Sequence, residues 1–166
     1  MEDQVLFARQ DEVNVLKFVG RIRFQICSAV ESFLKKIHDE KRLFPIVIDL
    51  IETKSIDSTV LGLLAQIAIR SINEVHHKPT VLVSCYDILR VLRCMSFARV
   101  FNILQGDGSS PGAFQEIKPL RTDETDMRDR ILTAHRTLMS LSAENRTKFE
   151  TVVKMLEKES LEKPDS

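Results

Sequence analysis

The sequence predicts an α/β fold: a mixed sheet of four to five strands, helices packed mainly on one face, and a helical extension at the C-terminal end. Three observations predict it. Two β-rich runs lie together near the start, strand-like and helix-like segments then alternate, and from residue 122 the pattern is helical throughout. A hairpin followed by strand–helix units gives a sheet with antiparallel and parallel neighbours. We therefore expect a domain over residues 1–120 and an extension over residues 121–162.

The first two strands are expected at residues 4–9 and 13–19. The polar turn Gln10-Asp11-Glu12 separates them, and Gly20 ends the second. Two short apolar-rich runs around a polar turn are typical of a β-hairpin. Apolar residues then recur at helical spacing from Ile22 to Ile37, which predicts an amphipathic helix.

The middle of the chain alternates between buried strands and helices. The compact run Ile-Val-Ile-Asp-Leu at 46–50 predicts a buried strand. The apolar stretch from Val60 to Ile72 is too long for a strand and predicts a helix, for which Asp57 and Ser58 are both suitable N-caps. We expect a strand at 80–83, a short helix at 88–95 and a last strand at 101–104, while 114–120 shows no clear pattern.

A linker and a helical tail complete the chain. Residues 106–112 hold three of the five glycines and predict a linker. Thr122 is the expected cap of a tail helix, Ser142 offers a second N-cap, and each following segment carries an apolar stripe. This pattern fits either a helical hairpin or one long helix kinked near Ser142. The last residues, 163–166, are expected to fray.

Composition excludes several classes of function. Lys+Arg and Asp+Glu both number 24, so the formal net charge is zero, which argues against a general nucleic-acid binder and against electrostatic membrane association. No apolar run approaches the ~18 residues that a membrane-spanning helix needs. The first residues lack the charged-then-apolar order of a signal peptide. We therefore expect a cytoplasmic protein without membrane insertion.

Motifs for catalysis and metal binding are missing from the sequence. The three cysteines are widely spaced with no CxxC pair, which supports neither a disulfide framework nor a zinc site. There is no phosphate loop, nucleophile elbow or dinucleotide-binding motif. His38 and the adjacent pair His76-His77 fit solvated helix ends, and His135 has no Cys or His nearby in sequence. We expect no enzymatic activity, no cofactor and no metal.

The most specific feature is the run at 46–50 followed by Ile-Asp-Ser-Thr-Val-Leu-Gly-Leu-Leu at 56–64. A buried strand ending in Asp49 precedes Asp57-Ser58 at the head of an apolar helix that contains Gly62. This arrangement resembles the STAS domain, the fold of anti-anti-sigma factors, over roughly residues 5–104. The resemblance implies that Asp49 and Gly62 shape the site. Val60 departs from the family pattern, which has a glycine there.

The resemblance implies a phosphorylation site at Ser58, modified by a partner kinase and reset by a phosphatase. A helix N-terminus tolerates added negative charge, and a phosphate adds about −1.5 to −2 charges at neutral pH. Thr59 stays open as the modified residue, and a plain N-capping role for Ser58 is the structural alternative.

The helix after Ser58 carries a second apolar stripe opposite the one that faces the sheet. A helix on the outer face of a sheet is ordinarily polar there, so this stripe is either a docking surface or a face covered by the chain's own tail. The predicted partner-binding residues are Asp57, Ser58, Thr59, Val60, Leu63 and Ile67.

The tail extends the resemblance. Residues 134–139 and 141–146, together with 18–24, are similar to HsbA-type anti-anti-sigma factors. That subfamily implies a bacterial adaptor whose kinase and phosphatase is a response regulator. It implies that the unphosphorylated form binds an anti-sigma factor and that the phosphorylated form can engage a diguanylate cyclase. The alternatives are a STAS subunit of a membrane transporter complex and a nucleotide-binding module. The oligomeric state stays open.

Overall fold

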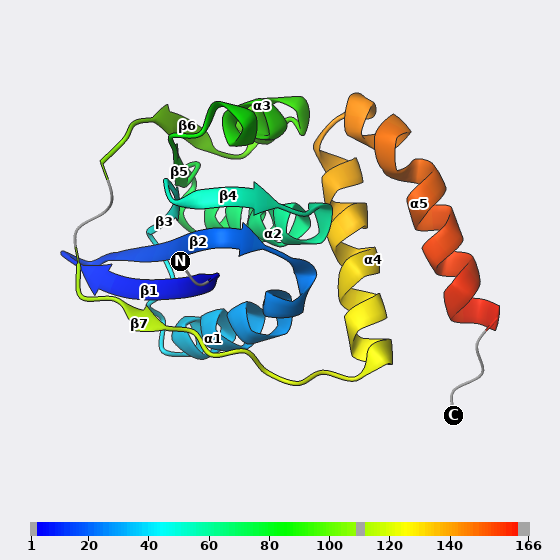
Figure 1. The fold of residues 1–166 in the computed structure, drawn as a ribbon, viewed down its shortest axis with the longest axis horizontal. Helices are drawn as coiled ribbons and strands as arrows, with labels where there is room; N and C mark the ends of the chain where they lie inside the picture. The colour runs from blue at the N-terminus through cyan, green and yellow to red at the C-terminus, as the bar shows by residue number, and fades with distance from the viewer. Residues whose placement is uncertain (1–2, 109–111, 163–166) are drawn as a thin grey trace.

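A computed structural model describes residues 3–108 and 112–162 (Figure 1). Its centre is a seven-stranded mixed sheet in the order β6-β5-β3-β2-β1-β7, with β4 paired to β2 outside this path. The α/β class predicted from the sequence is confirmed. The expected four to five strands are too few, because two short polar strands join the sheet.

The N-terminal hairpin is confirmed. Strands β1 (Gln4–Gln10) and β2 (Val13–Ile22) pair antiparallel over their length. Asp11 and Glu12 between them both have positive φ, at 52° and 65°. A two-residue turn with two positive φ values matches the right-handed twist of paired strands, so it closes the hairpin tightly.

The parallel part of the sheet follows from three strand–helix units. Strands β3 (Ile46–Leu50), β5 (Thr80–Val83) and β6 (Asn102–Gln105) run parallel to β2 and to one another. Helices α1 (Cys27–Asp39), α2 (Ser58–Val75) and α3 (Tyr86–Cys94) lie between them in sequence. A 3-10 turn (Phe24–Ile26) precedes α1, so the helix starts later than Ile22, and a second 3-10 turn (Phe97–Arg99) follows α3.

The two strands absent from the prediction are β4 (Thr53–Ile56) and β7 (Gln115–Glu116). β4 pairs parallel with the end of β2 past a register shift at Gly20, and β7 pairs antiparallel with β1. Both carry polar side chains and neither shows an apolar alternation. Their pairing partners, rather than their own sequence, place them in the sheet.

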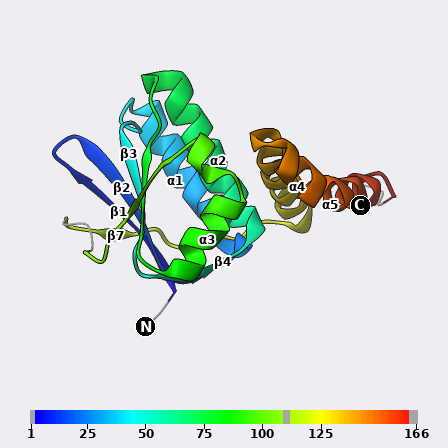
Figure 2. The ribbon, with the colours of Figure 1, turned by 90° about the horizontal axis from the view of Figure 1, so that it is seen from above.

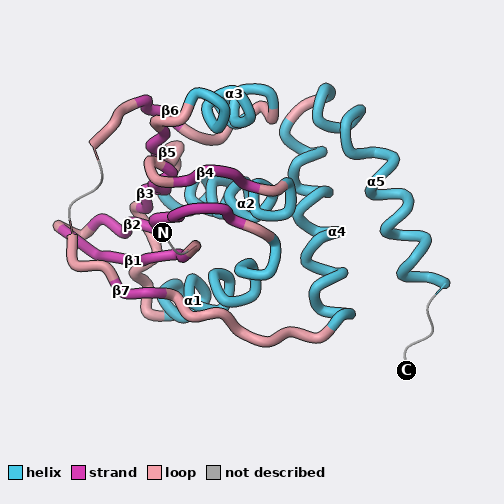
Figure 3. The backbone as a smooth tube through the Cα atoms, viewed as in Figure 1, coloured by secondary structure: helices cyan, strands magenta, loops and turns pink. Residues whose placement is uncertain are grey.

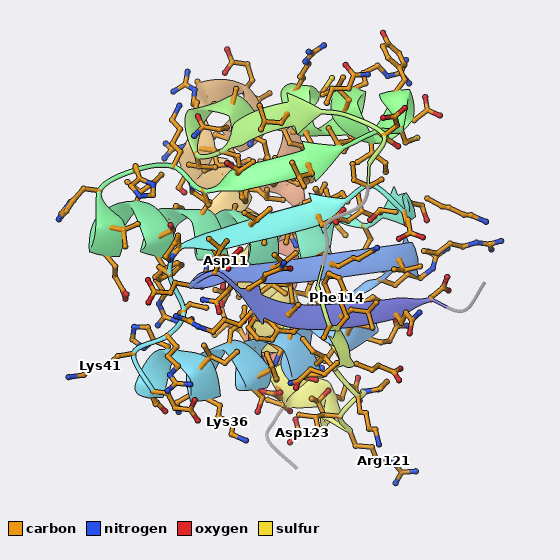
Figure 4. All side chains as sticks on the ribbon, turned by 90° about the vertical axis from the view of Figure 1, so that its left-hand side faces the viewer. Asp11, Lys36, Lys41, Phe114, Arg121 and Asp123 are labelled. Carbon is orange, nitrogen blue, oxygen red and sulfur yellow. The ribbon has the colours of Figure 1, made fainter. Side chains whose placement is uncertain are left out.

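The helices that the structure describes lie on one side of the sheet, as Figure 2 shows. Phe7 of β1 packs edge-on against Phe33 of α1, with ring centroids 4.8 Å apart. Leu16 pairs with Phe7 in register and is fully buried, so it lies on the same face. On the opposite face, the Lys17 ammonium pairs with Glu52 and lies 5.4 Å from the centre of the Phe114 ring. Figure 4 shows the segment that carries Phe114 crossing in front of the first two strands.

The tail forms a helical hairpin, which decides between the two predicted forms. Helix α4 (Glu124–Leu141) runs along one end of the molecule, and α5 (Ala143–Glu162) returns beside it (Figures 1 and 3). Ser142 between them is extended, and its Oγ accepts the backbone N–H of Asn145 at 3.1 Å, which confirms Ser142 as an N-cap. At the start of α4 the cap is Asp123, not Thr122, and it accepts the N–H of Asp126 at 2.7 Å.

Part of the predicted linker lies outside the described residues, at 109–111, and so do the C-terminal residues 163–166. Within the described ranges, no helix has the length and apolar character needed to cross a membrane.

Candidate functional site

The N-terminus of α2 lies where β4 ends, close to the middle of α4 (Figure 3). Asp57 is its N-cap: one carboxylate oxygen accepts the N–H of Val60 at 2.9 Å, and the other accepts the N–H of Phe24 at 2.7 Å. The Asp57 carboxylate therefore fixes the start of α2 to the junction between β2 and α1. Of the two caps that the sequence allows, Asp57 fills the position and leaves the Ser58 hydroxyl available for another contact.

Ser58 contacts the tail. Its Oγ lies 2.8 Å from Nε2 of His135, a residue of α4 that is 77 positions away in the sequence. Nδ1 of His135 lies 2.7 Å from the carbonyl oxygen of Ile131, which can only accept a hydrogen bond. In the neutral imidazole the proton is therefore on Nδ1, and Nε2 accepts the hydrogen bond that the Ser58 hydroxyl donates. Ser58 itself stays half-buried.

His135 is a site residue that the sequence reasoning dismissed. It is only 6% exposed, and its ring packs edge-on against Phe149 of α5 at 5.4 Å between centroids. The one signal in the sequence is its place beside Ala134 in the buried stripe of α4. The partner that gives it a role comes from a distant part of the chain, so local spacing could not identify it.

Gly62 is the point where α2 and α4 come closest. A Cβ placed on Gly62 would lie 2.4 Å from the carbonyl oxygen of Ala134 and 2.5 Å from the Ala134 Cβ. No side chain fits at that separation, because real Cβ atoms do not approach other atoms within 3.0 Å. Gly62 is thus the residue that allows α4 to approach α2 closely, one helical turn from Ser58.

The second apolar stripe of α2 is buried, with Val60, Leu63 and Ile67 at 0%, 2% and 5% exposure. The sequence left open whether a partner or the chain's own tail covers this stripe. In the structure α4 packs on Gly62, which lies about 160° around the helix from Val60 and about 140° from Ile67. Leu63 and Ile67 line the cavity between α1, α2 and α4, and the tail residues Leu138, Leu141 and Phe149 belong to the same large apolar core as the stripe. Thr59 is also buried, at 6% exposure.

Asp49 lies away from the surface and shapes the loop that leads toward α2. Its side chain is fully buried in β3, and Oδ1 accepts the N–H of Ile51 at 2.9 Å. The same loop is also held by Ser84, the residue after β5, whose hydroxyl donates to the Ile51 carbonyl at 3.3 Å.

A second polar contact holds the turn of the tail hairpin. Asn145 is fully buried, and its side-chain amide donates to the carbonyls of Met95 at 2.8 Å and Leu138 at 2.9 Å. The hydroxyls of Ser96 and Ser142 lie 2.6 Å apart. This turn contact joins the hairpin to the segment after α3, at the opposite end of α4 from its first turn.

A cavity of about 650 Å³ lies between α1, α2 and α4. It is lined by apolar side chains of Leu34 and Leu63 and by charges from all three helices. Arg130 faces it but is already paired with Glu31 and with Asp126, the latter at 3.0 Å. His38 at its rim contacts Glu74 at 2.8 Å.

The remaining histidines and the glycine-rich segment occupy the surface. His76 is the left-handed C-cap of α2, and His77 is exposed. A Cβ added to Gly106 or Gly108 would meet no atom within 4 Å. Among the residues that the structure describes, no group of three or more His, Cys, Asp or Glu side chains is arranged to hold a metal ion.

No protein-family model matches the chain, and no curated protein matches it significantly.

Proposed function

We propose that this protein is a phosphorylation-switched, protein-binding adaptor of the anti-anti-sigma type, with Ser58 as the phospho-acceptor. The observation that carries the proposal is the placement of Ser58. Its hydroxyl stands half-buried at the first turn of α2, freed from capping by Asp57 and within hydrogen-bond distance of the tail. A modification at this one atom changes the contact between the domain and its extension.

The same geometry favours Ser58 over Thr59. Thr59 is 6% exposed, so its hydroxyl is out of reach of a kinase without unfolding of the helix end. A phosphate on Ser58 lies at a helix N-terminus, where the backbone N–H groups and the helix dipole favour negative charge.

In this proposal the unphosphorylated form binds an anti-sigma factor, and a response regulator with kinase and phosphatase activity sets the state of Ser58. The resemblance to HsbA-type factors supports these partners, with a diguanylate cyclase as a partner of the phosphorylated form. Asp57 and Ser58 are reachable for a partner in the present conformation, whereas Val60, Leu63 and Ile67 are buried and are not available to a partner.

The test is phosphorylation by the cognate regulator kinase with ATP, followed on a phosphate-affinity gel. We expect the wild type and Thr59→Ala to shift and Ser58→Ala not to shift. Ser55→Ala is the matched control, because Ser55 is exposed on β4 three residues away. An equal shift of the wild type and Ser58→Ala would remove Ser58 from the proposal.

A capture experiment addresses the partners. Wild type, Ser58→Ala and Ser58→Asp are used as bait in the native cytosol and membrane fractions. An anti-sigma factor retained by Ser58→Ala and lost from Ser58→Asp is the expected result. Capture of a membrane ATPase independent of the residue at 58 would contradict the switch and point to the transporter alternative.

A further inference from the structure

We propose that the α4–α5 hairpin covers a second partner-binding surface on α2, and that phosphorylation of Ser58 releases the hairpin from this surface. This inference rests on the proposed function, because it takes Ser58 as the modified residue. The surface is the side of α2 that carries Gly62 next to Ser58, and its partner is an amphipathic helix that presents a small residue to Gly62.

The first support is the fit of the occupant. Ala134 lies directly on Gly62, at a separation that excludes a side chain at residue 62. A contact between a glycine and an alanine allows two helix backbones to approach closely and requires the small residue on the incoming helix. The surface therefore selects helices by this position, and α4 meets the requirement from within the chain.

The second support is the chemistry between Ser58 and His135. The neutral imidazole offers only an acceptor, Nε2, toward Ser58, because Nδ1–H is bound to the Ile131 carbonyl. A phosphate on Ser58 removes the hydroxyl donor and places acceptor oxygens beside an acceptor nitrogen. The exchanged contact is repulsive only while the imidazole is neutral, but in either state the phosphate requires space where the nearly buried ring now lies, and this displacement of the ring carries the release.

Nearby charges do not offset this loss. The Asp57 carboxylate is adjacent and carries the same sign as the phosphate, although its oxygens are occupied by two backbone N–H groups. On α4, Arg130 already pairs with Glu31 and Asp126. A phosphate that recruited Arg130 would have to break both pairs.

The turn contact explains how the hairpin can move without leaving the protein. Asn145, Ser142 and Ser96 join the turn to the segment after α3, and none of them touches Ser58. Lys148 adds a hydrogen bond from its ammonium to the Cys94 carbonyl at 2.6 Å. Loss of the Ser58–His135 contact thus loosens α4 around His135 while the turn contact persists.

Two states then present two surfaces. The unphosphorylated protein keeps α2 covered and presents the closed assembly of domain and hairpin. The phosphorylated protein exposes the Gly62 side of α2 to a different partner. A single modification therefore exchanges one binding partner for another instead of only repelling the first.

The test places phosphoserine at residue 58 of the full chain during synthesis, so that no kinase is needed, and follows amide hydrogen exchange across 124–141. We expect exchange about tenfold faster than in the unmodified chain, the effect of losing one buried hydrogen bond with a charged group left behind. Phosphoserine at residue 55 is the control, because it adds the same charge nearby without facing His135.

The variant His135→Ala, combined with phosphoserine at residue 58, completes a double-mutant cycle. Alone it should accelerate exchange in 124–141, and phosphoserine at 58 should then add little, because the contact on which the phosphate acts is already gone. Unchanged or slower exchange in phosphoserine-58 protein overturns the release, even where Ser58 proves to be the phosphorylated residue. Faster exchange without any change of partner would instead overturn the proposed function.

The surface itself is probed with a fluorescent peptide of residues 124–141 that carries His135→Ala. Fluorescence anisotropy should show tighter binding to phosphoserine-58 protein than to unmodified protein. The same peptide with Ala134→Leu should not bind, because the leucine meets Gly62. Equal binding of both peptides, or no gain on phosphorylation, overturns the assignment of this surface.

Discussion

At the scale of single residues, the neighbours Asp57 and Ser58 have different roles in the candidate site. Asp57 satisfies the backbone N–H groups of Val60 and Phe24, and this leaves the Ser58 hydroxyl to meet His135. Either residue could serve as an N-cap by its chemistry alone. Their roles differ because the carboxylate has two acceptor oxygens and the β2–α1 junction supplies a second donor.

Replacement of Asp57 by alanine tests the role of its carboxylate. We expect a loss of about 1–2 kcal/mol in the free energy of unfolding, because the helix loses its cap and the Phe24 N–H loses its acceptor. Urea denaturation measures it. Asp123→Ala is the matched control, since Asp123 caps α4 in an exposed position and accepts a single N–H. Equal losses for the two variants would contradict a second role for Asp57.

The Cys27 thiol reports on burial beneath the site. Burial raises its pKa from 9.0 to about 12, the Asp57 carboxylate adds to the rise, and Arg130 opposes it. Between these two values the unfolded chain loses the thiol proton while the folded protein keeps it, so folding stability falls as the pH rises. The stability difference between wild type and Cys27→Ala should therefore be constant below pH 9.0 and change above it.

Alkylation provides the direct measurement. At about pH 8, iodoacetamide should modify exposed Cys94 rapidly and buried Cys27 only after unfolding, because the thiolate is the reactive form. Rapid modification of Cys27 in the folded protein would contradict the raised pKa.

At the scale of elements, the contact between α2 and α4 depends on one missing side chain. Gly62 in a helix interior costs stability relative to alanine, by roughly 1 kcal/mol in an exposed helix. Here the close approach of Ala134 requires it. The intrinsic preference of α2 and the packing of α4 therefore oppose each other at this residue.

Gly62→Ala separates the two effects. We expect α4 to be displaced, with faster hydrogen exchange in 124–141, while the sheet and α2 keep their protection. Gly106→Ala is the control, because no atom lies within 4 Å of the added Cβ. A Gly62→Ala protein that is more stable than wild type, with α4 still protected, would contradict the requirement for glycine at this contact.

The elements that sequence patterns predicted correctly are those with strong apolar periodicity. The hairpin, the buried strands at 46–50 and 80–83, and the helix after Ser58 are of this kind. β4 and β7 were missed because Thr53-Lys54-Ser55 and Gln115-Glu116 are polar, and only their pairing with β2 and β1 makes them strands. The cap at Asp123 was missed because Thr122 beside it has the same capping chemistry.

At the scale of the whole molecule, the tail and the sheet share one apolar core. Leu138 of α4 is fully buried in the same cluster as Leu16 of β2 and Val60 of α2. The hairpin is therefore part of the folded unit, and the proposed release from α2 has to leave the turn contact and part of this core in place.

The balance of charges governs how partners approach. With a formal net charge of zero, the unmodified protein exerts little long-range attraction or repulsion. We expect the association rate of the proposed anti-sigma partner with the unmodified protein to change little between low and high ionic strength. Phosphoserine at 58 should introduce a clear salt dependence, since about two negative charges are added at one place. Stopped-flow fluorescence measures both, and a strong salt dependence before modification would contradict this account.

The sequence by itself determined the α/β class, the N-terminal hairpin, the helical tail and Ser58 as the residue to examine. Periodicity and capping are local, so they can be read within a few turns of chain. Tertiary structure alone decided that the tail is a hairpin, that α4 packs on Gly62, and that His135 meets Ser58. These contacts join residues up to 77 positions apart, and a pairing over that separation depends on how the helices pack, which no local pattern records.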